Sequence, residues 1–192
     1  MFFMSTIGII GNIVGGIAMS IFLVSSFLKT KKQILSFQSV AHVLLAISEA
    51  LMQTFSSIVQ EAVSLIRNIS VILGKNTKWL NIFLVSFGTI FGIVANIVWD
   101  GNSWIGYLPV FANLEYAIVV VSNTNSQKVL KISLGISSLL WAVFFLVSAN
   151  YLAGCFNTAT GSIALITGIV LTIKDLRNKN KTEEANKKDM SE

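Results

Sequence analysis

Residues 5–32, STIGIIGNIVGGIAMSIFLVSSFLKTKK, are an apolar run that ends in a basic cluster, Lys29, Lys31 and Lys32. The run is long enough to cross a membrane once, because a transmembrane α-helix needs about 20 apolar residues. No basic segment precedes it, and it is longer than the apolar part of a signal peptide. We therefore predict that residues 5–28 form a retained first transmembrane helix.

Basic residues recur in clusters along the rest of the chain. Further clusters lie at residues 75–78, 128–131 and 174–188, and only Arg67 of the 14 Lys and Arg residues stands apart. Each interval between clusters holds enough apolar sequence for two crossings, at about 20 residues per crossing. Two crossings return the chain to the side that it left, so all four clusters lie on one face. The positive-inside rule identifies that face as the cytoplasm.

The apolar segments between and beside these clusters predict seven transmembrane helices. We expect them at residues 5–28, 33–53, 55–73, 79–98, 105–122, 129–148 and 152–173. The loop at residues 99–104 has a Trp at each end, one acid and no base, which is typical of an external interface. The N-terminus is therefore expected outside and the C-terminus in the cytoplasm. Residues 175–192 are mostly polar or charged, and we expect a disordered cytoplasmic tail.

A shift of 96 residues superposes the main landmarks of the chain. Lys32 falls on Lys128, and Lys78 falls on Lys174. Few residues are identical in this register, so the shift indicates a repeat of architecture rather than of sequence. A seven-span protein with evenly spaced loops also shows such a shift without any repeat, and that alternative stays open.

The repeat predicts the fold class, an all-α polytopic membrane protein of 3+1+3 plan. Residues 1–78 form a first three-helix bundle, residues 79–98 a linker helix, and residues 99–174 a second bundle. Because three is odd, the linker lets both bundles enter the membrane in the same sense, as in SWEET-type transporters. Gly88 and Gly92 in the linker are spaced for close helix contact. They would equally permit a dimer, so a monomer and a homo-oligomer both remain open.

The composition excludes several classes of protein. The chain is 54% hydrophobic and 12% charged, whereas soluble domains average about 25% charged residues. The net charge of +5 predicts no nucleic-acid partner, because the bases bracket apolar spans instead of gathering on one exposed face. One His and one Cys cannot form a metal site of the usual kind. We find no phosphate-binding loop and no nucleophile–base set, so we expect neither a cofactor nor an enzyme.

Polar residues inside the predicted spans are the candidates for function, because such groups are costly in a bilayer and usually face a cavity or a partner. His42, Arg67 and Glu115 fall near the midplane. The simplest arrangement pairs Arg67 with Glu115 and places His42 nearby. Glu61 and Asn157 lie nearer the outside, and they occupy equivalent positions in the 96-residue repeat.

Four other residues carry expectations of their own. Trp141 lies at mid-depth, where it either walls a binding pocket or faces lipid or the core. Glu49 falls near the outer surface and is expected at the interface. Pro109 lies inside the fifth span, where proline kinks a helix. Cys155 follows apolar sequence and is expected to be a small core residue.

Two functions are compatible with these positions. In the first, the chain is a transporter or facilitator of a small polar solute that binds between the bundles. Its site residues would be Arg67 and Glu115 for charge, His42, Glu61 and Asn157 for hydrogen bonds, and Trp141 for stacking. In the second, the same groups form a closed cluster that clamps the helices of a non-transporting scaffold or partner subunit. Both interpretations imply the lipid bilayer as a partner.

Specific residues along the chain also form a pattern known from one protein family. They are Phe27–Lys32, Gln33–Ser36, His42, Leu65–Asn68, Trp79, Leu108–Val110 and Trp141. Through them, over residues 14–175, the chain resembles the YgjV family of small bacterial inner-membrane proteins, which has no assigned activity. The resemblance implies a bacterial cytoplasmic membrane as the location.

A wider likeness, through the 3+1+3 plan alone, is to SWEET sugar transporters and PnuC vitamin transporters. SWEET proteins have several prolines in their moving helices, and this chain has only Pro109. The aromatic-rich substrate motif of PnuC proteins is absent. Asn157 is similar to the SWEET pocket asparagines, but its repeat equivalent is Glu61. The likeness concerns the fold and does not imply a sugar or a vitamin as substrate.

Overall fold

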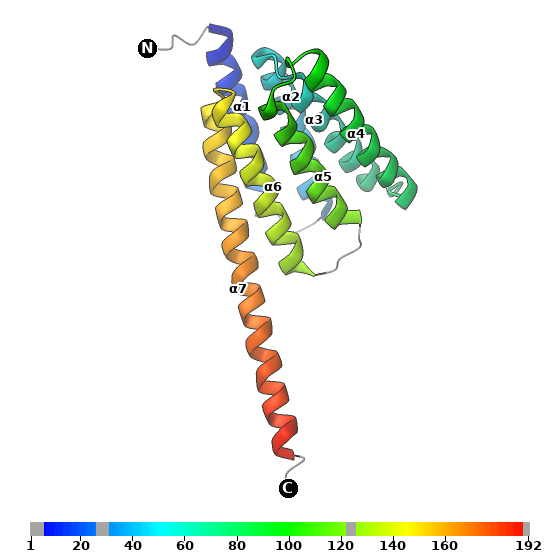
Figure 1. The fold of residues 1–192 in the computed structure, drawn as a ribbon, viewed down its shortest axis with the longest axis vertical. Helices are drawn as coiled ribbons and strands as arrows, with labels where there is room; N and C mark the ends of the chain where they lie inside the picture. Colours follow the sequence, from blue (N-terminus) through cyan, green and yellow to red (C-terminus); the bar gives the residue numbers. More distant parts are fainter. Residues whose placement is uncertain (1–5, 26–30, 122–125, 190–192) are drawn as a thin grey trace.

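The computed structural model describes residues 6–25, 31–121 and 126–189. Within them all regular secondary structure is helical and there is no strand (Figure 1). The helices are α1 Thr6–Ser25, α2 Lys31–Met52, α3 Phe55–Ile72, α4 Lys78–Val98, the 3-10 turn η1 Trp104–Gly106, α5 Tyr107–Val121, α6 Gln127–Val147 and α7 Tyr151–Asp189.

Each of the seven predicted spans coincides with one of these helices. By length and apolar composition, α1, α2, α4 and α7 can each cross a membrane, among the described residues. The other three fall short for different reasons. α5 has only 15 residues, and the described apolar part of α6 is a shorter stretch, Lys131–Val147. α3 is 18 residues long and includes Gln60, Glu61 and Arg67.

Six helices form a closed ring in the order α1, α2, α3, α5, α6, α7 and back to α1, because each of these neighbours packs against the next. α4 lies outside this six-helix ring and packs on α3 and α5 (Figure 1). The contacts of α1 with α7 and of α3 with α5 join the first three helices to the last three. The ring therefore encloses an interior to which both halves of the chain contribute.

The outer faces of the helices are apolar and the interior is rich in polar groups. Large exposed hydrophobic residues occur on every helix, and buried polar residues include Asn12, Gln60, Asn68 and Asn96. Trp79, Trp99 and Trp104 are exposed near helix ends, where tryptophan is enriched at membrane interfaces. A surface of this kind fits lipid rather than water, because water-soluble proteins avoid extended exposed apolar patches.

The turns that join α2 to α3 and α6 to α7 have the same local structure. Gln53 and Ala149, which stand 96 residues apart, both have a φ of 59°, a value uncommon for residues other than glycine. The amide of Gln53 donates to the carbonyl of Ala50 at 3.2 Å, and that of Ala149 donates to the carbonyl of Leu146 at 3.3 Å. Ala50 and Leu146 also stand 96 residues apart.

Polar contacts fasten α1 to both of these hairpins. Asn12 Nδ2 donates to the carbonyl of Ala149 at 2.6 Å. Ser48 Oγ donates to the carbonyl of Gly11 at 2.7 Å and accepts from Asn150 Nδ2 at 2.9 Å. These bonds satisfy polar groups that lipid could not, which matters because an unpaired polar group is costly in a bilayer. They hold the ring closed at the end opposite the basic residues.

Glycines let α7 approach α6 closely. A Cβ atom at Gly154, Gly161 or Gly168 would lie between 2.6 and 3.0 Å from a side chain of α6, respectively that of Leu146, Leu139 or Ile132. Both sets of residues recur every seven positions, so a row of glycines receives a row of branched side chains. Gly88 and Gly92 of α4 likewise lie against α3 and α5. The close helix contact predicted for Gly88 and Gly92 is confirmed.

Three expectations from the sequence, those for Pro109, Cys155 and residues 175–192, are wrong. Pro109 lies in the first turn of α5, where a proline removes no helical hydrogen bond, so it does not kink a mid-span helix. Cys155 is exposed on the outer side of α7 instead of in the core. The expected disordered tail at residues 175–192 is replaced by helix as far as Asp189, since residues 169–192 contain neither glycine nor proline to end it.

Candidate functional site: a polar cavity inside the ring

A cavity of about 110 Å³ lies inside the six-helix ring, and all six helices contribute to its wall. We call it the central cavity. A space of this size can hold several water molecules or a small solute, because one ordered water needs about 10–15 Å³ on the same measure. Its polar and aromatic lining residues are Phe22, Gln38, His42, Glu61, Ser64, Arg67, Asn113, Tyr116, Ser137, Ser138, Trp141, Phe145 and Asn157.

Five of the six residues that the sequence predicts for a binding site line this cavity: His42, Glu61, Arg67, Trp141 and Asn157. They come from α2, α3, α6 and α7, so the fold brings together side chains that are far apart in the sequence. The sixth, Glu115, is not among the lining residues. Whether the five bind a solute stays a prediction.

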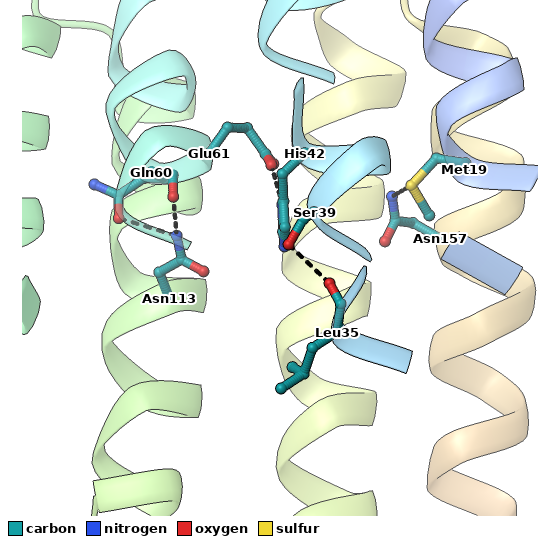
Figure 2. Close-up of polar contacts among 8 residues, drawn as sticks. All are labelled: Met19, Leu35, Ser39, His42, Gln60, Glu61, Asn113 and Asn157. Atoms are coloured by element: carbon teal, nitrogen blue, oxygen red, sulfur yellow. Dashed lines mark hydrogen bonds and ion pairs between the residues drawn. The ribbon is translucent and has the colours of Figure 1, made fainter. Parts of the chain in front are cut away.

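His42 and Glu61 form a buried pair between α2 and α3, in which His42 Nδ1 contacts Glu61 Oε2, and the contact is an ion pair when His42 is protonated (Figure 2). The ring of Phe22 from α1 meets the imidazole edge-on, with 5.4 Å between the ring centroids. Removing one partner of a buried pair is strongly destabilising, because the other is left uncompensated. The pair therefore joins three helices and also places a titratable group on the cavity wall.

The predicted pairing of Arg67 with Glu115 is wrong. Among the described residues, the ion pairs are His42–Glu61 and one at the surface, Lys128–Asp175. The Arg67 guanidinium instead lies over the ring of Tyr116, with Cζ 5.7 Å from the ring centroid, a cation–π geometry.

The reason for the error is the rotation of α5. Adjacent residues of an α-helix point about 100° apart, which follows from 3.6 residues per turn. Tyr116 lines the central cavity, so Glu115 is turned toward Ser133 of α6. Neither Glu115 Oε2 nor Ser133 Oγ makes a full hydrogen bond with a described residue. The two groups are neighbours whose geometry falls short of a hydrogen bond.

A second polar group, not predicted from the sequence, ties α3, α4 and α5 together. Asn113 Nδ2 donates to Gln60 Oε1 at 3.1 Å (Figure 2), and Gln60 Nε2 donates to the carbonyl of Gly88 at 2.8 Å. Gln60 immediately precedes the candidate Glu61, and both it and Asn113 stand within apolar segments. The position of uncharged amides inside predicted spans is the signal that would have identified them.

Asn157 and Trp141 form the wall opposite the ion pair. Asn157 Nδ2 donates to Met19 Sδ at 3.3 Å (Figure 2) and to the carbonyl of Ala153, also at 3.3 Å. Trp141 stacks on Phe145 with 5.3 Å between ring centroids and is 8% exposed. Trp141 belongs to the packed core and also borders the cavity, and its role in binding stays a prediction.

The 96-residue register relates residues on the two walls of the cavity. Four pairs of lining residues stand 96 positions apart, namely Gln38 and Leu134, His42 and Ser138, Leu45 and Trp141, and Glu61 and Asn157. The shift found between basic clusters in the sequence thus also relates positions in the interior.

Glu49 is buried, although an interfacial position was expected. Its side chain is 1% exposed, and neither carboxyl oxygen has a hydrogen-bond partner among the described residues. It interacts electrostatically with Glu61 and with Asp100. Asp100 belongs to the loop between α4 and α5, and it accepts hydrogen bonds from the amides of Phe55 and Ser56 at 2.8 Å each. This loop therefore contacts the start of α3 and brings Asp100 near Glu49.

The apolar exterior and the polar interior define an all-helical integral membrane protein. Residues 9–176 match the family Imp-YgjV, described as bacterial inner membrane protein. The chain belongs to that family, which confirms the resemblance seen in the sequence, and the family description gives the bacterial inner membrane as its location. No curated protein and no solved structure matches the chain.

Proposed function

We propose that the chain is a transporter or facilitator of a small polar solute that binds in the central cavity. The observation that carries this proposal is the cavity itself, because it is lined by an ion pair, a guanidinium, an asparagine and a tryptophan. Groups of these kinds inside a bilayer are typical of solute pathways. One chain supplies the whole lining, so a monomer suffices, and no catalytic step is part of the proposal.

The proposed architecture is seven membrane spans in a 3+1+3 plan, with α4 as the linker. The equivalent turns at Gln53 and Ala149 support it, as do the four pairs of lining residues 96 positions apart. α3, α5 and α6 would span the membrane as shielded members of the ring, where a polar or short helix is tolerated. In such transporters, binding near the midplane between repeats precedes a rocking motion.

Each lining residue has a proposed role. Arg67 supplies positive charge, and the His42–Glu61 pair and Asn157 offer hydrogen bonds. Trp141 provides a flat apolar face against which part of the solute can stack. Glu115 lies outside the cavity lining, and we leave it out of the proposed site.

The proposal is tested by the reactivity of cysteines placed on α6. Exposed Cys155 is first replaced in a Cys155→Ser background. Ser138, which lines the cavity, is then changed to cysteine, with Ser133→Cys as the matched control, since Ser133 is buried but not a lining residue. Membrane-impermeant thiol reagents are applied to vesicles of both orientations. We expect Ser138→Cys to react from at least one side and Ser133→Cys to stay unreactive.

The second candidate function is a non-transporting scaffold or partner subunit. The contacts that favour it are the His42–Glu61 pair and the Gln60–Asn113 bond, since both join neighbouring helices inside the protein. A Ser138→Cys variant that reacts from neither side, in a protein shown to be folded, would mean a closed interior and would favour the scaffold.

A further inference from the structure

The charges that line the central cavity do not pair completely. Its ionisable lining residues are His42, Glu61, Arg67 and the phenol of Tyr116. The Glu61 carboxylate contacts His42 and also interacts electrostatically with Arg67, but no carboxylate of the described residues lies within ion-pair distance of Arg67. With Glu61 ionised, the cavity is neutral while His42 is neutral. It carries one net positive charge once His42 is protonated.

An arginine without a carboxylate partner in this position indicates what the solute supplies. A guanidinium inside a membrane protein is costly unless a counter-charge compensates it. Its planar fork of donors matches a carboxylate, which it can bind through two parallel hydrogen bonds. The aromatic rings of Phe22, Trp141 and Phe145 also line the cavity, and they suit an apolar group of limited size.

We propose that the solute is a small organic monoanion, a carboxylate whose acid group binds Arg67, and that it moves together with one proton carried by the His42–Glu61 pair. This inference rests on the proposed transport function and names its substrate class. The loaded cavity is then neutral, because the added proton and the added anion cancel. The empty cavity is neutral too, so neither form moves a net charge through the low-dielectric interior.

The groups around the ion pair leave His42 as the switch of cavity charge. From α3 the pair faces Arg67, and from α5 it faces Tyr116. Glu49 of α2 interacts with Glu61, and Asp100 of the α4–α5 loop interacts in turn with Glu49. The lining residues that α1, α6 and α7 contribute carry no ionisable side chain. Protonation of the pair adds a positive charge near the anion site, so carboxylate affinity rises as pH falls.

The test uses the purified full chain and two matched sets of probes. Benzoate is compared with benzamide and benzylamine, and propionate with propionamide and propylamine. Binding is followed by the shift of the thermal unfolding midpoint during titration. We expect the carboxylates to stabilise the protein, more strongly at lower pH, and the amides and amines to have no effect. Carboxylate binding in weakly buffered solution is expected to take up protons.

Variants assign these effects to residues. Arg67→Gln is expected to weaken carboxylate binding by at least about tenfold, because a charge-assisted bidentate contact is lost. Arg67→Lys keeps the positive charge but loses the planar fork of donors. Its affinity for carboxylates should therefore lie between those of the wild type and of Arg67→Gln. Lys75→Gln, at an exposed base beyond α3, should bind like the wild type. His42→Gln is expected to weaken carboxylate binding and to make the binding that remains independent of pH and free of proton uptake, a change that a purely structural effect would not produce.

The outcomes separate this inference from the proposed function. An amide or amine that binds as well as its carboxylate, or carboxylate binding unaffected by Arg67→Gln, overturns the anion assignment and leaves a transporter of another solute. Carboxylate binding without proton uptake overturns the coupling. If Ser138→Cys reacts but no carboxylate binds, the anion assignment is again wrong. If Ser138→Cys reacts from neither side, the transport function fails, and this inference fails with it.

Discussion

The side chain of Asp100, in the loop between α4 and α5, caps the N-terminus of α3. Its carboxylate receives the first two free amides of α3, those of Phe55 and Ser56, although Thr54 stands at the N-cap position and makes no side-chain cap bond. A carboxylate at a helix N-terminus also interacts favourably with the helix dipole. The cap comes from 45 residues away, which no local sequence pattern indicates.

This geometry predicts the effect of replacing Asp100. Asp100→Ala should lower the stability of the protein by about 1–2 kcal/mol, since it removes a helix cap. Asp100→Asn keeps one acceptor oxygen and should cost less. The measurement is thermal unfolding of the purified variants in one detergent. Equal stability of Asp100→Ala and the wild type would show that the cap contributes nothing.

At the scale of single residues, the sequence predicts which side chains matter better than it predicts their partners. Polar residues in apolar spans identified four lining residues of the cavity, because their cost in lipid forces them inward, and the mid-depth position of Trp141 identified a fifth. The pairing of Arg67 depended on the rotation of α5 about its axis, which hydrophobic pattern does not define for a helix apolar on most sides. Glu49 was misplaced because its position near the end of a span suggested an interface, whereas its side chain is buried in the folded protein.

The helices themselves were largely predictable, since apolar length between basic clusters defines each span. The structure differs from these predictions at the start of α5 and at the end of α7. Pro109 lies in the first turn of α5 and does not bend the helix, because the 3-10 turn Trp104–Gly106 comes directly before α5. The end of α7 differs because a polar segment without glycine or proline can continue an established helix.

The glycine row on α7 leads to a prediction at the scale of helix packing. Gly161→Val should destabilise the protein by about 1–3 kcal/mol, the usual cost of overpacking, because a Cβ there would meet Leu139 and the carbonyl of Gly135 at 3.0 and 3.1 Å. Ala159→Val, on the exposed side of the same helix, is the control. Thermal unfolding of both variants compares them, and equal losses would contradict the close packing of α6 and α7.

For the whole molecule, the described basic residues near helix ends lie at one end of the ring. Lys32, Lys78 and Lys128 are close to the starts of α2, α4 and α6, at the end toward which α7 runs (Figure 1). The opposite end carries the loop with Trp99 and Trp104. This distribution follows from antiparallel neighbours and is the part of the whole-molecule arrangement that the sequence defined most directly. The closed ring, by contrast, depends on side-chain contacts between helices remote in sequence.

The charge distribution predicts the orientation in the membrane. By the positive-inside rule the lysine-rich end faces the cytoplasm. A fluorescent protein fused after residue 189 should therefore fluoresce, and alkaline phosphatase inserted at Gly101 should be active, since that enzyme needs an oxidising external compartment. In the control the two reporters exchange places, and we then expect neither fluorescence nor phosphatase activity. The reverse pattern would invert the topology and place the Trp99–Trp104 loop inside the cell.

The four pairs of cavity residues have a consequence for the direction in which a solute lies. In two of them the ionisable member belongs to the first half of the chain, with His42 related to Ser138 and Glu61 to Asn157. Arg67 also belongs to that half, and Trp141 to the other. The two walls are thus related in position but differ in chemical character. A molecule with an acid group at one end and an apolar group at the other has one favourable orientation between such walls, with its acid group toward the first half of the chain.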